Sequence, residues 1–147
     1  MNAPRLETAL RERLAALGAS LGEREAAHAG ALAAARERAV ALRRAVAAGL
    51  DAFHATAASA GAPGLRVELS EPRLDDKHVR AVQFELRRGR HQAIVTVKSR
   101  GEVTLVGPFQ AGKTEGPCKS FPFDAELEIE KALGDFLERF AEEAATP

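Results

Sequence analysis

The first sixty residues repeat apolar side chains at intervals of three and four positions, which is the period of one helix face. One run of this pattern lies within residues 10 to 21, and a second lies within residues 32 to 53. The same sixty residues hold 22 alanines, and alanine has the highest helix propensity of all residues. The sequence therefore predicts a long, coiled-coil-like N-terminal helical segment. The residues of its apolar seam are Leu10, Leu14, Leu17, Leu21, Leu32, Ala35, Ala39, Leu42, Val46, Leu50 and Phe53.

The gap between the two runs leaves the number of helices open. Gly22 and Gly30 stand in this gap, and Ser20-Leu-Gly-Glu23 has the form of a capping box, which begins helices. The gap is also close to three full helical turns long, so a single helix would keep the two parts of the seam aligned. We expect either one long helix with a weak point near residues 18 to 30 or two helices that meet there.

The middle of the chain changes to the two-residue alternation of half-buried strands. Glycine and proline in residues 59–65 end the helical pattern, and residues 71–78 form a polar connection. The links between the later strands are too short for a parallel crossover, so neighbouring strands must be antiparallel. We predict a four-stranded antiparallel meander with strands at residues 65–69, 81–86, 91–99 and 102–107. A long surface loop of about twelve residues is expected to follow.

The last part of the chain predicts a C-terminal helix that packs on the sheet. Its apolar face consists of Ile129, Leu133, Phe136, Leu137 and Phe140. The predicted class is therefore α+β, with a long N-terminal helical segment, a four-stranded antiparallel meander and a C-terminal helix on the sheet. We assign residues 1–60 to a helical oligomerisation segment and residues 61–147 to an α+β domain, which together form one structural unit.

The length of the N-terminal helix points to a partner. A continuous helix of roughly 55 residues would be about 80 Å long, whereas a globule of the remaining residues would be about 25 to 30 Å across. One domain of this size cannot cover such a seam, and an uncovered apolar seam is unfavourable in water. A second copy of the chain is the expected cover, which predicts a homodimer. The alternative is a helical hairpin that bends at the glycines and covers its own seam.

The composition limits the partners and the compartment. The 147 residues hold 21 basic and 21 acidic side chains, so no attraction of the whole molecule to nucleic acid or a membrane is expected. The chain contains neither an apolar run long enough to span a membrane nor a visible export signal. A single cysteine, Cys118, suits a reducing compartment and permits no internal disulfide. These features predict a cytoplasmic protein.

Residues Gly107 to Thr114 match the phosphate-binding pattern G-x-x-x-x-G-K-S/T at every required position. That pattern needs a helix immediately after it, and Pro117 restricts the first turn. It also belongs to mainly parallel sheets, whereas the neighbouring strands here are predicted to be antiparallel. We therefore interpret the match as chance and expect no nucleotide hydrolysis. A weaker role remains, in which the loop binds a phosphate, another anion or a small molecule through Gly112, Lys113, Thr114 and Lys119.

A second alternative rests on a basic hairpin. Residues 80 to 100 hold six basic side chains and one acidic side chain, Glu85. An arginine-rich hairpin tip can grip nucleic-acid phosphates, but no aromatic residue lies between the arginines to stack on bases, so nucleic acid is not the expected partner. The candidate contact residues for nucleic acid or a protein partner are Arg87, Arg88 and Arg90.

The remaining reactive residue types do not form a predicted site. Cys118 has no histidine at a recognisable spacing and is expected to be a partly buried, inert thiol, and the four histidines are isolated from one another. We therefore predict no catalytic residue, no metal site and no cofactor. The sequence predicts a non-enzymatic, self-associating interaction or adaptor protein that forms a homodimer through its N-terminal helix and presents its hairpin and loop to an unidentified protein partner.

Overall fold

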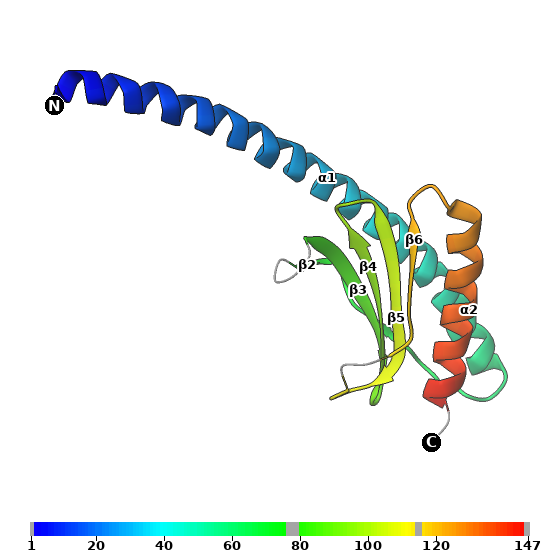
Figure 1. The fold of residues 1–147 in the computed structure, drawn as a ribbon. Coiled ribbons are helices and arrows are strands. Elements are labelled where there is room, and N and C mark those ends of the chain that lie inside the picture. The colour runs from blue at the N-terminus through cyan, green and yellow to red at the C-terminus, as the bar shows by residue number, and fades with distance from the viewer. Residues whose placement is uncertain (1, 76–79, 114–115, 146–147) are drawn as a thin grey trace.

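The protein has two layers, an antiparallel sheet and two helices that lie on one face of it (Figure 1). A computed structural model describes residues 2–75, 80–113 and 116–145. In chain order these residues form a long helix, six strands and a second helix. The predicted α+β class, with its N-terminal helix, antiparallel sheet and C-terminal helix, is confirmed.

The N-terminal helix α1 (Ala3–Ser59) is one continuous helix of 57 residues. Of the two arrangements that the sequence left open, the single helix is therefore the one observed. The glycines within it each cost about 1 kcal/mol relative to alanine, and the surrounding alanines have the propensity to offset that cost. Just beyond the end of the helix, Gly61 has a φ of 98°, and the amide of Ala62 donates to the carbonyl of Ala57 over 2.8 Å.

The sheet contains six strands among the described residues, in contrast to the four that the sequence predicted. Its order is β1-β3-β4-β5-β6, with β2 also paired to β3, and all of these pairs are antiparallel. The strands are β1 (Glu68–Leu69), β2 (Arg73–Asp75), β3 (Ala81–Arg88), β4 (His91–Lys98), β5 (Glu102–Gln110) and β6 (Cys118–Pro122).

The two additional strands pair through their backbones and bury little of their own surface. Leu74 in the middle of β2 is 50% exposed, and most of β6 is exposed. Neither strand therefore shows the alternation of buried and exposed residues on which the sequence prediction depended. The expected long loop after residue 107 is shortened at both ends, because β5 continues to Gln110 and β6 begins at Cys118.

The core lies between the helices and one face of the three central strands. Phe84 of β3 pairs with Val95 of β4, and Val95 pairs with Leu105 of β5, so these side chains point to the same face. All three are buried in one cluster with residues of both helices. The second half of α1 is thus part of the same core as the domain after residue 60. Its buried members are Ala35, Ala39, Val46 and Leu50.

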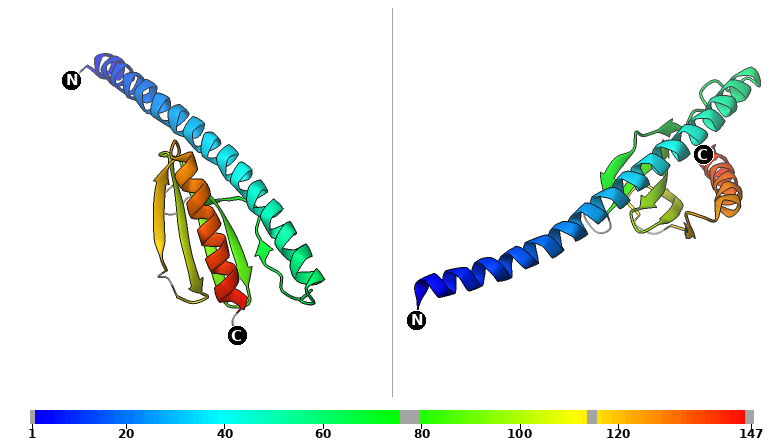
Figure 2. Two further views of the ribbon diagram at one scale, coloured as in Figure 1. Left: turned by 90° about the vertical axis from the view of Figure 1, so that its right-hand side faces the viewer. Right: turned by 90° about the horizontal axis from the view of Figure 1, so that it is seen from above.

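The second helix, α2 (Glu126–Ala145), lies beside α1 over β5 and β4 (Figure 2). Four of the five residues predicted for its apolar face are buried, and Leu137 is partly buried against the core. The segment that leads into α2 also contacts α1, because the guanidinium of Arg38 lies 4.5 Å from the ring centre of Phe123. This contact holds the end of β6 close to the point where α1 crosses the sheet.

Candidate functional site

The first half of α1 projects beyond the sheet and contacts no other element along most of its length (Figures 1 and 2). Every residue from 2 to 27 is exposed, and we call residues 3–27 the protruding segment. It carries five of the eight large apolar side chains that the described part of the chain exposes. Their exposed fractions are 44% for Leu6, 46% for Leu10, 62% for Leu14, 50% for Leu17 and 45% for Leu21.

These five leucines, which we call the leucine seam, lie on the helix face that packs on the sheet further along. With 100° per residue, the seam and the four buried α1 residues fall within an arc of about 80°. The same face of α1 is therefore buried where the helix lies over the sheet and exposed to solvent in the protruding segment. An isolated surface leucine is ordinary, but a continuous apolar stripe on a projecting helix is typical of a contact surface.

The boundary between the two halves of this face is well defined. Glu25, near the end of the protruding segment, reaches the sheet through an ion pair of 3.6 Å from its Oε2 to Nη1 of Arg80. His28 is half-buried, and its Nε2 is buried without a hydrogen-bond partner among the described residues. From Ala35 onward the face is part of the core.

The described residues of the phosphate-binding pattern, 107–113, form the end of one strand and the turn after it. Gly107 to Gln110 belong to β5, Gly112 lies in the turn that follows, and β6 begins at Cys118. Two β5 residues, Gly107 and Pro108, lie opposite one β4 residue at this point, which makes a β-bulge. The next described element is thus a strand and not the helix that binds phosphates in that motif.

The predicted anion-binding residues do not converge. Gly112 and Lys113 are exposed in the turn, and Thr114 lies outside the described residues. Lys119 lies further along, on β6 opposite Leu105, and its side chain is on the helix face of the sheet. Among the predicted anion-binding residues that the structure describes, only Lys119 lines a groove.

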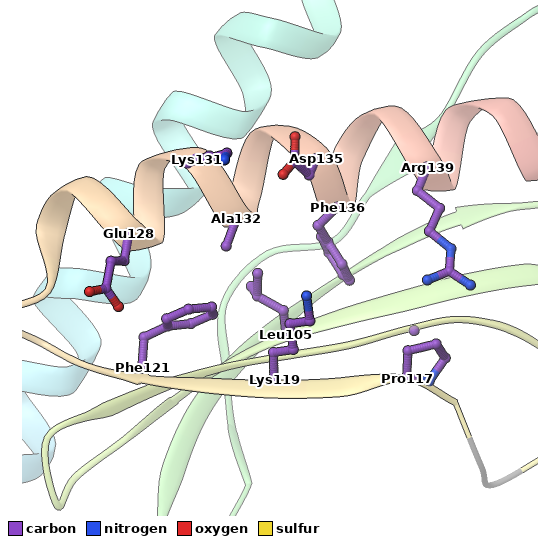
Figure 3. A pocket seen from close by; sticks show the side chains of 11 residues that line it. Leu105, Pro117, Lys119, Phe121, Glu128, Lys131, Ala132, Asp135, Phe136 and Arg139 are labelled. Carbon is purple, nitrogen blue, oxygen red and sulfur yellow. The ribbon is translucent and has the colours of Figure 1, made fainter.

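This groove runs between β6 and α2 and has a volume of about 400 Å³ (Figure 3). Leu105 and Phe136 form its apolar floor, and the ammonium of Lys119 points across them toward α2. The guanidinium of Arg139 lies at the end of the groove that is nearest to Pro117. Its Nε also forms an ion pair with Oε1 of Glu143 over 3.1 Å. The lining residues are Leu105, Gly107, Pro117, Lys119, Phe121, Glu128, Lys131, Ala132, Asp135, Phe136 and Arg139.

The groove is amphipathic, with more positive than negative charge at its Pro117 end. Lys119 has no carboxylate within ion-pair distance in the ranges that the structure describes. Glu128 lies at the opposite end beside Phe121. The sequence predicted Lys119 as a ligand-binding residue but assigned neither Phe136 nor Arg139 to a site, because these residues meet Lys119 only when α2 packs on the sheet.

The three arginines of the basic hairpin have different environments. Arg87 pairs with Glu85 over 3.4 Å, and Arg90 is exposed. Arg88 is half-buried and donates to three backbone carbonyls, those of Gly64, Arg66 and Ala144. Its guanidinium thus joins β3 to the end of α2 and to the segment before β1. The predicted contact surface of this hairpin therefore depends on Arg87 and Arg90.

Other reactive groups add no further site. Cys118 was expected to be partly buried, but it is an exposed free thiol at the start of β6, because β6 is an edge strand. No group of three or more metal-ligating side chains comes together in the residues that the structure covers. Within that same part of the chain, neither helix combines the length and the apolar character needed to cross a membrane.

Comparison of the chain with protein-family models, with curated proteins and with solved structures gives no match. The function is therefore inferred from the geometry of the two candidate sites, the leucine seam and the β6–α2 groove.

Proposed function

We propose that the protein is a non-enzymatic, self-associating interaction module whose leucine seam binds a second copy of the chain. The observation that carries this proposal is the exposure of Leu6, Leu10, Leu14, Leu17 and Leu21 on a helix that projects from its own domain. Covering one half-exposed leucine contributes about 1 kcal/mol, and a homodimer that pairs Leu10, Leu14, Leu17 and Leu21 of both copies covers eight of them.

A second copy fits this surface because no described part of the same chain covers the five leucines. All five leucines of the seam are exposed, and α1 is a single continuous helix and not a hairpin that would fold back on its own seam. Apolar seams at intervals of three and four residues pack against similar seams on other helices. The module then acts as an adaptor, with its dimer formed by α1 and its sheet domains free to bind a protein partner. A cytoplasmic location is part of this proposal, because the single exposed thiol of Cys118 suits a reducing compartment.

A double substitution in the seam tests self-association. Leu14→Glu with Leu17→Glu places four carboxylates in the centre of the dimer without touching the core. Size-exclusion chromatography with light scattering should give a dimer mass for the natural chain and the 15.6 kDa monomer mass for the variant. Leu127→Glu is the matched control, since Leu127 is an 81% exposed leucine on α2, and it should leave the dimer intact. Equal masses for the natural chain and the double variant would contradict the proposal.

A second candidate function is the binding of an amphipathic organic anion in the β6–α2 groove. The observation that favours it is the ammonium of Lys119, which has no ion-pair partner among the described residues. This ammonium lies beside the apolar side chains of Leu105 and Phe136. A ligand with a short apolar body and one carboxylate or phosphate would match both features. This candidate relocates the predicted anion site from the 112–114 turn to the groove.

Ligand-induced stabilisation distinguishes this candidate from an empty groove. Octanoate at millimolar concentration should raise the thermal unfolding midpoint, whereas uncharged octanol at equal concentration should raise it less. Lys119→Ala should remove the difference between the two ligands. If octanoate fails to stabilise the natural chain, the groove is not a site for this class of anion.

A further inference from the structure

The direction in which two seams pair can be inferred from the position of the sheet on α1. We propose that two copies pair antiparallel along their protruding segments, in the register that places residue i of one copy opposite residue 31 − i of the other. This inference rests on the self-association proposed above and adds the orientation, the register and the residues that fix them.

The sheet obstructs a parallel pair. In a parallel pair the partner helix would follow α1 in the same direction and along the same face. From Leu32 onward that face already packs against the sheet and the core. The helix of a parallel partner would therefore have to bend away from the seam near Leu21. The partner is a copy of α1, which is one continuous helix through this region.

An antiparallel pair avoids this obstruction. In the proposed register Ala3 of the partner lies opposite His28, and His28 is the first half-buried residue beyond the protruding segment. The partner helix thus runs along the bare part of the face and stops where the sheet begins. Each protruding segment, about 37 Å long, covers the other over its full length.

The same register matches four of the five seam leucines with one another, whereas Leu6 lies opposite the partner's Glu25. Leu10 faces the partner's Leu21, and Leu14 faces the partner's Leu17, so the symmetric pair contains four leucine layers. A shift by one heptad in either direction would place Leu17 against a glutamate or Leu14 against an arginine of the partner. Among antiparallel registers that keep the seams in contact, this one therefore buries the most leucine surface.

Charge complementarity distinguishes the orientations independently. Glu7 and Arg24 occupy the seam positions that flank the four leucine layers, one on each side. In the antiparallel register Glu7 faces the partner's Arg24, which gives two opposite-charge pairs in each dimer. In a parallel pair Glu7 would face the partner's Glu7, and Arg24 would face the partner's Arg24. Like charges at facing positions disfavour that orientation.

The consequence is a dimer with a domain at each end of a short two-helix connector. The two-fold axis passes between residues 15 and 16 of both copies. The two sheet domains begin on either side of it and lie about 37 Å apart, which is the length of the connector. Each domain therefore presents its own β6–α2 groove without contact with the other domain.

Disulfide cross-linking in the full chain tests the register. In a Cys118→Ser background, chains carrying Leu10→Cys are mixed with tagged chains carrying Leu21→Cys and equilibrated in a glutathione redox buffer. The antiparallel register predicts a mixed 10–21 disulfide as the main product and little dimer from Leu10→Cys alone, since the two copies of residue 10 lie about 17 Å apart along the axis. Ala19→Cys, which faces away from the seam, gives the background level.

The outcomes separate the two proposals. A dimer in which Leu10→Cys alone cross-links efficiently overturns the antiparallel register and leaves self-association standing. A natural chain that stays monomeric by sedimentation overturns both proposals. Cross-linking of the Leu10→Cys and Leu21→Cys mixture well above the Ala19→Cys background, together with weak homodimeric cross-linking, supports the register.

Charge reversal supplies a second readout that needs no added cysteine. Glu7→Arg and Arg24→Glu should each weaken the dimer roughly tenfold, because each replaces two opposite-charge pairs with two like-charge pairs. The double variant should regain an affinity close to that of the natural chain. In a parallel dimer neither single variant would weaken association, since each would merely exchange one like-charge pair for another, and that result would reject the antiparallel register.

Discussion

Oε2 of Glu25 in α1 lies 3.6 Å from Nη1 of Arg80, the residue immediately before β3, and this ion pair marks the place where the sheet meets the helix. Both side chains are more than half exposed, so the pair itself adds little stability. The pair is informative because it marks a boundary on α1. The apolar face of α1 is exposed to solvent before Glu25 and is part of the core from Ala35 onward. One helix thus provides both a domain core and an exposed seam.

Equal substitutions on the two halves of this face should have different effects. Leu50→Ala removes a side chain that is 9% exposed and should lower the free energy of unfolding by about 2 to 5 kcal/mol. Leu17→Ala should leave the stability of the monomeric domain within about 0.5 kcal/mol and should weaken the dimer instead. Chemical denaturation at a concentration that favours monomer, combined with light scattering at high concentration, measures both effects. A loss of domain stability for Leu17→Ala as large as that for Leu50→Ala would show that the seam is not a separate surface.

The sequence predicted the parts of the fold in which burial follows a simple period. The seam of α1, the apolar face of α2 and the alternation of Val82, Phe84 and Leu86 in β3 all belong to this group. Strand β2 was not predicted, because its central Leu74 remains exposed and its pairing with β3 depends on backbone hydrogen bonds. Strand β6 was not predicted for the same reason, since most of it is exposed and it pairs with β5 through the backbone. The bulge at Gly107 also interrupts the alternation of buried and exposed residues in β5.

The candidate sites were predictable to different degrees. Four of the five residues of the leucine seam follow from local spacing alone, and Leu6 was not predicted. Only the structure shows where the sheet stops covering this face of α1. The groove depends on tertiary packing, which brings Lys119 of β6 near Phe136 and Arg139 of α2. No spacing in the chain indicates that contact. The phosphate-binding pattern was interpreted as a chance match from the sequence, and the next described element after it is a strand, β6.

Arg88 should act as a structural residue. Arg88→Ala removes donors to the carbonyls of Gly64 at 2.9 Å, Arg66 at 3.1 Å and Ala144 at 3.3 Å. The loss should lower the free energy of unfolding by about 1 to 3 kcal/mol, because one carbonyl at the end of α2 and two carbonyls before β1 lose a cationic donor. Arg90→Ala is the control in the same hairpin and should change stability by less than about 0.5 kcal/mol. Equal effects in urea denaturation would contradict the structural role of Arg88.

Gly107 should tolerate no side chain. It has a φ of 111°, and a Cβ atom there would lie 3.1 Å from the carbonyl oxygen of Gln92 on β4. Gly107→Ala should therefore lower the free energy of unfolding by more than about 1 kcal/mol. Gly64→Ala is a suitable comparison, because a methyl group added there would have no atom of a non-neighbouring residue within 4 Å, and it should change stability by less than about 0.5 kcal/mol. Thermal or urea denaturation measures the difference, and a neutral Gly107→Ala would argue against the bulge at this position.

Self-association of the natural chain is the central claim, and sedimentation equilibrium tests it most directly. Runs over a concentration range that extends to tens of micromolar should show a mass that rises from 15.6 kDa toward twice that value, with a single monomer–dimer equilibrium describing all of the data. A mass of 15.6 kDa at every concentration would contradict the claim, since the leucine seam would then remain exposed in solution.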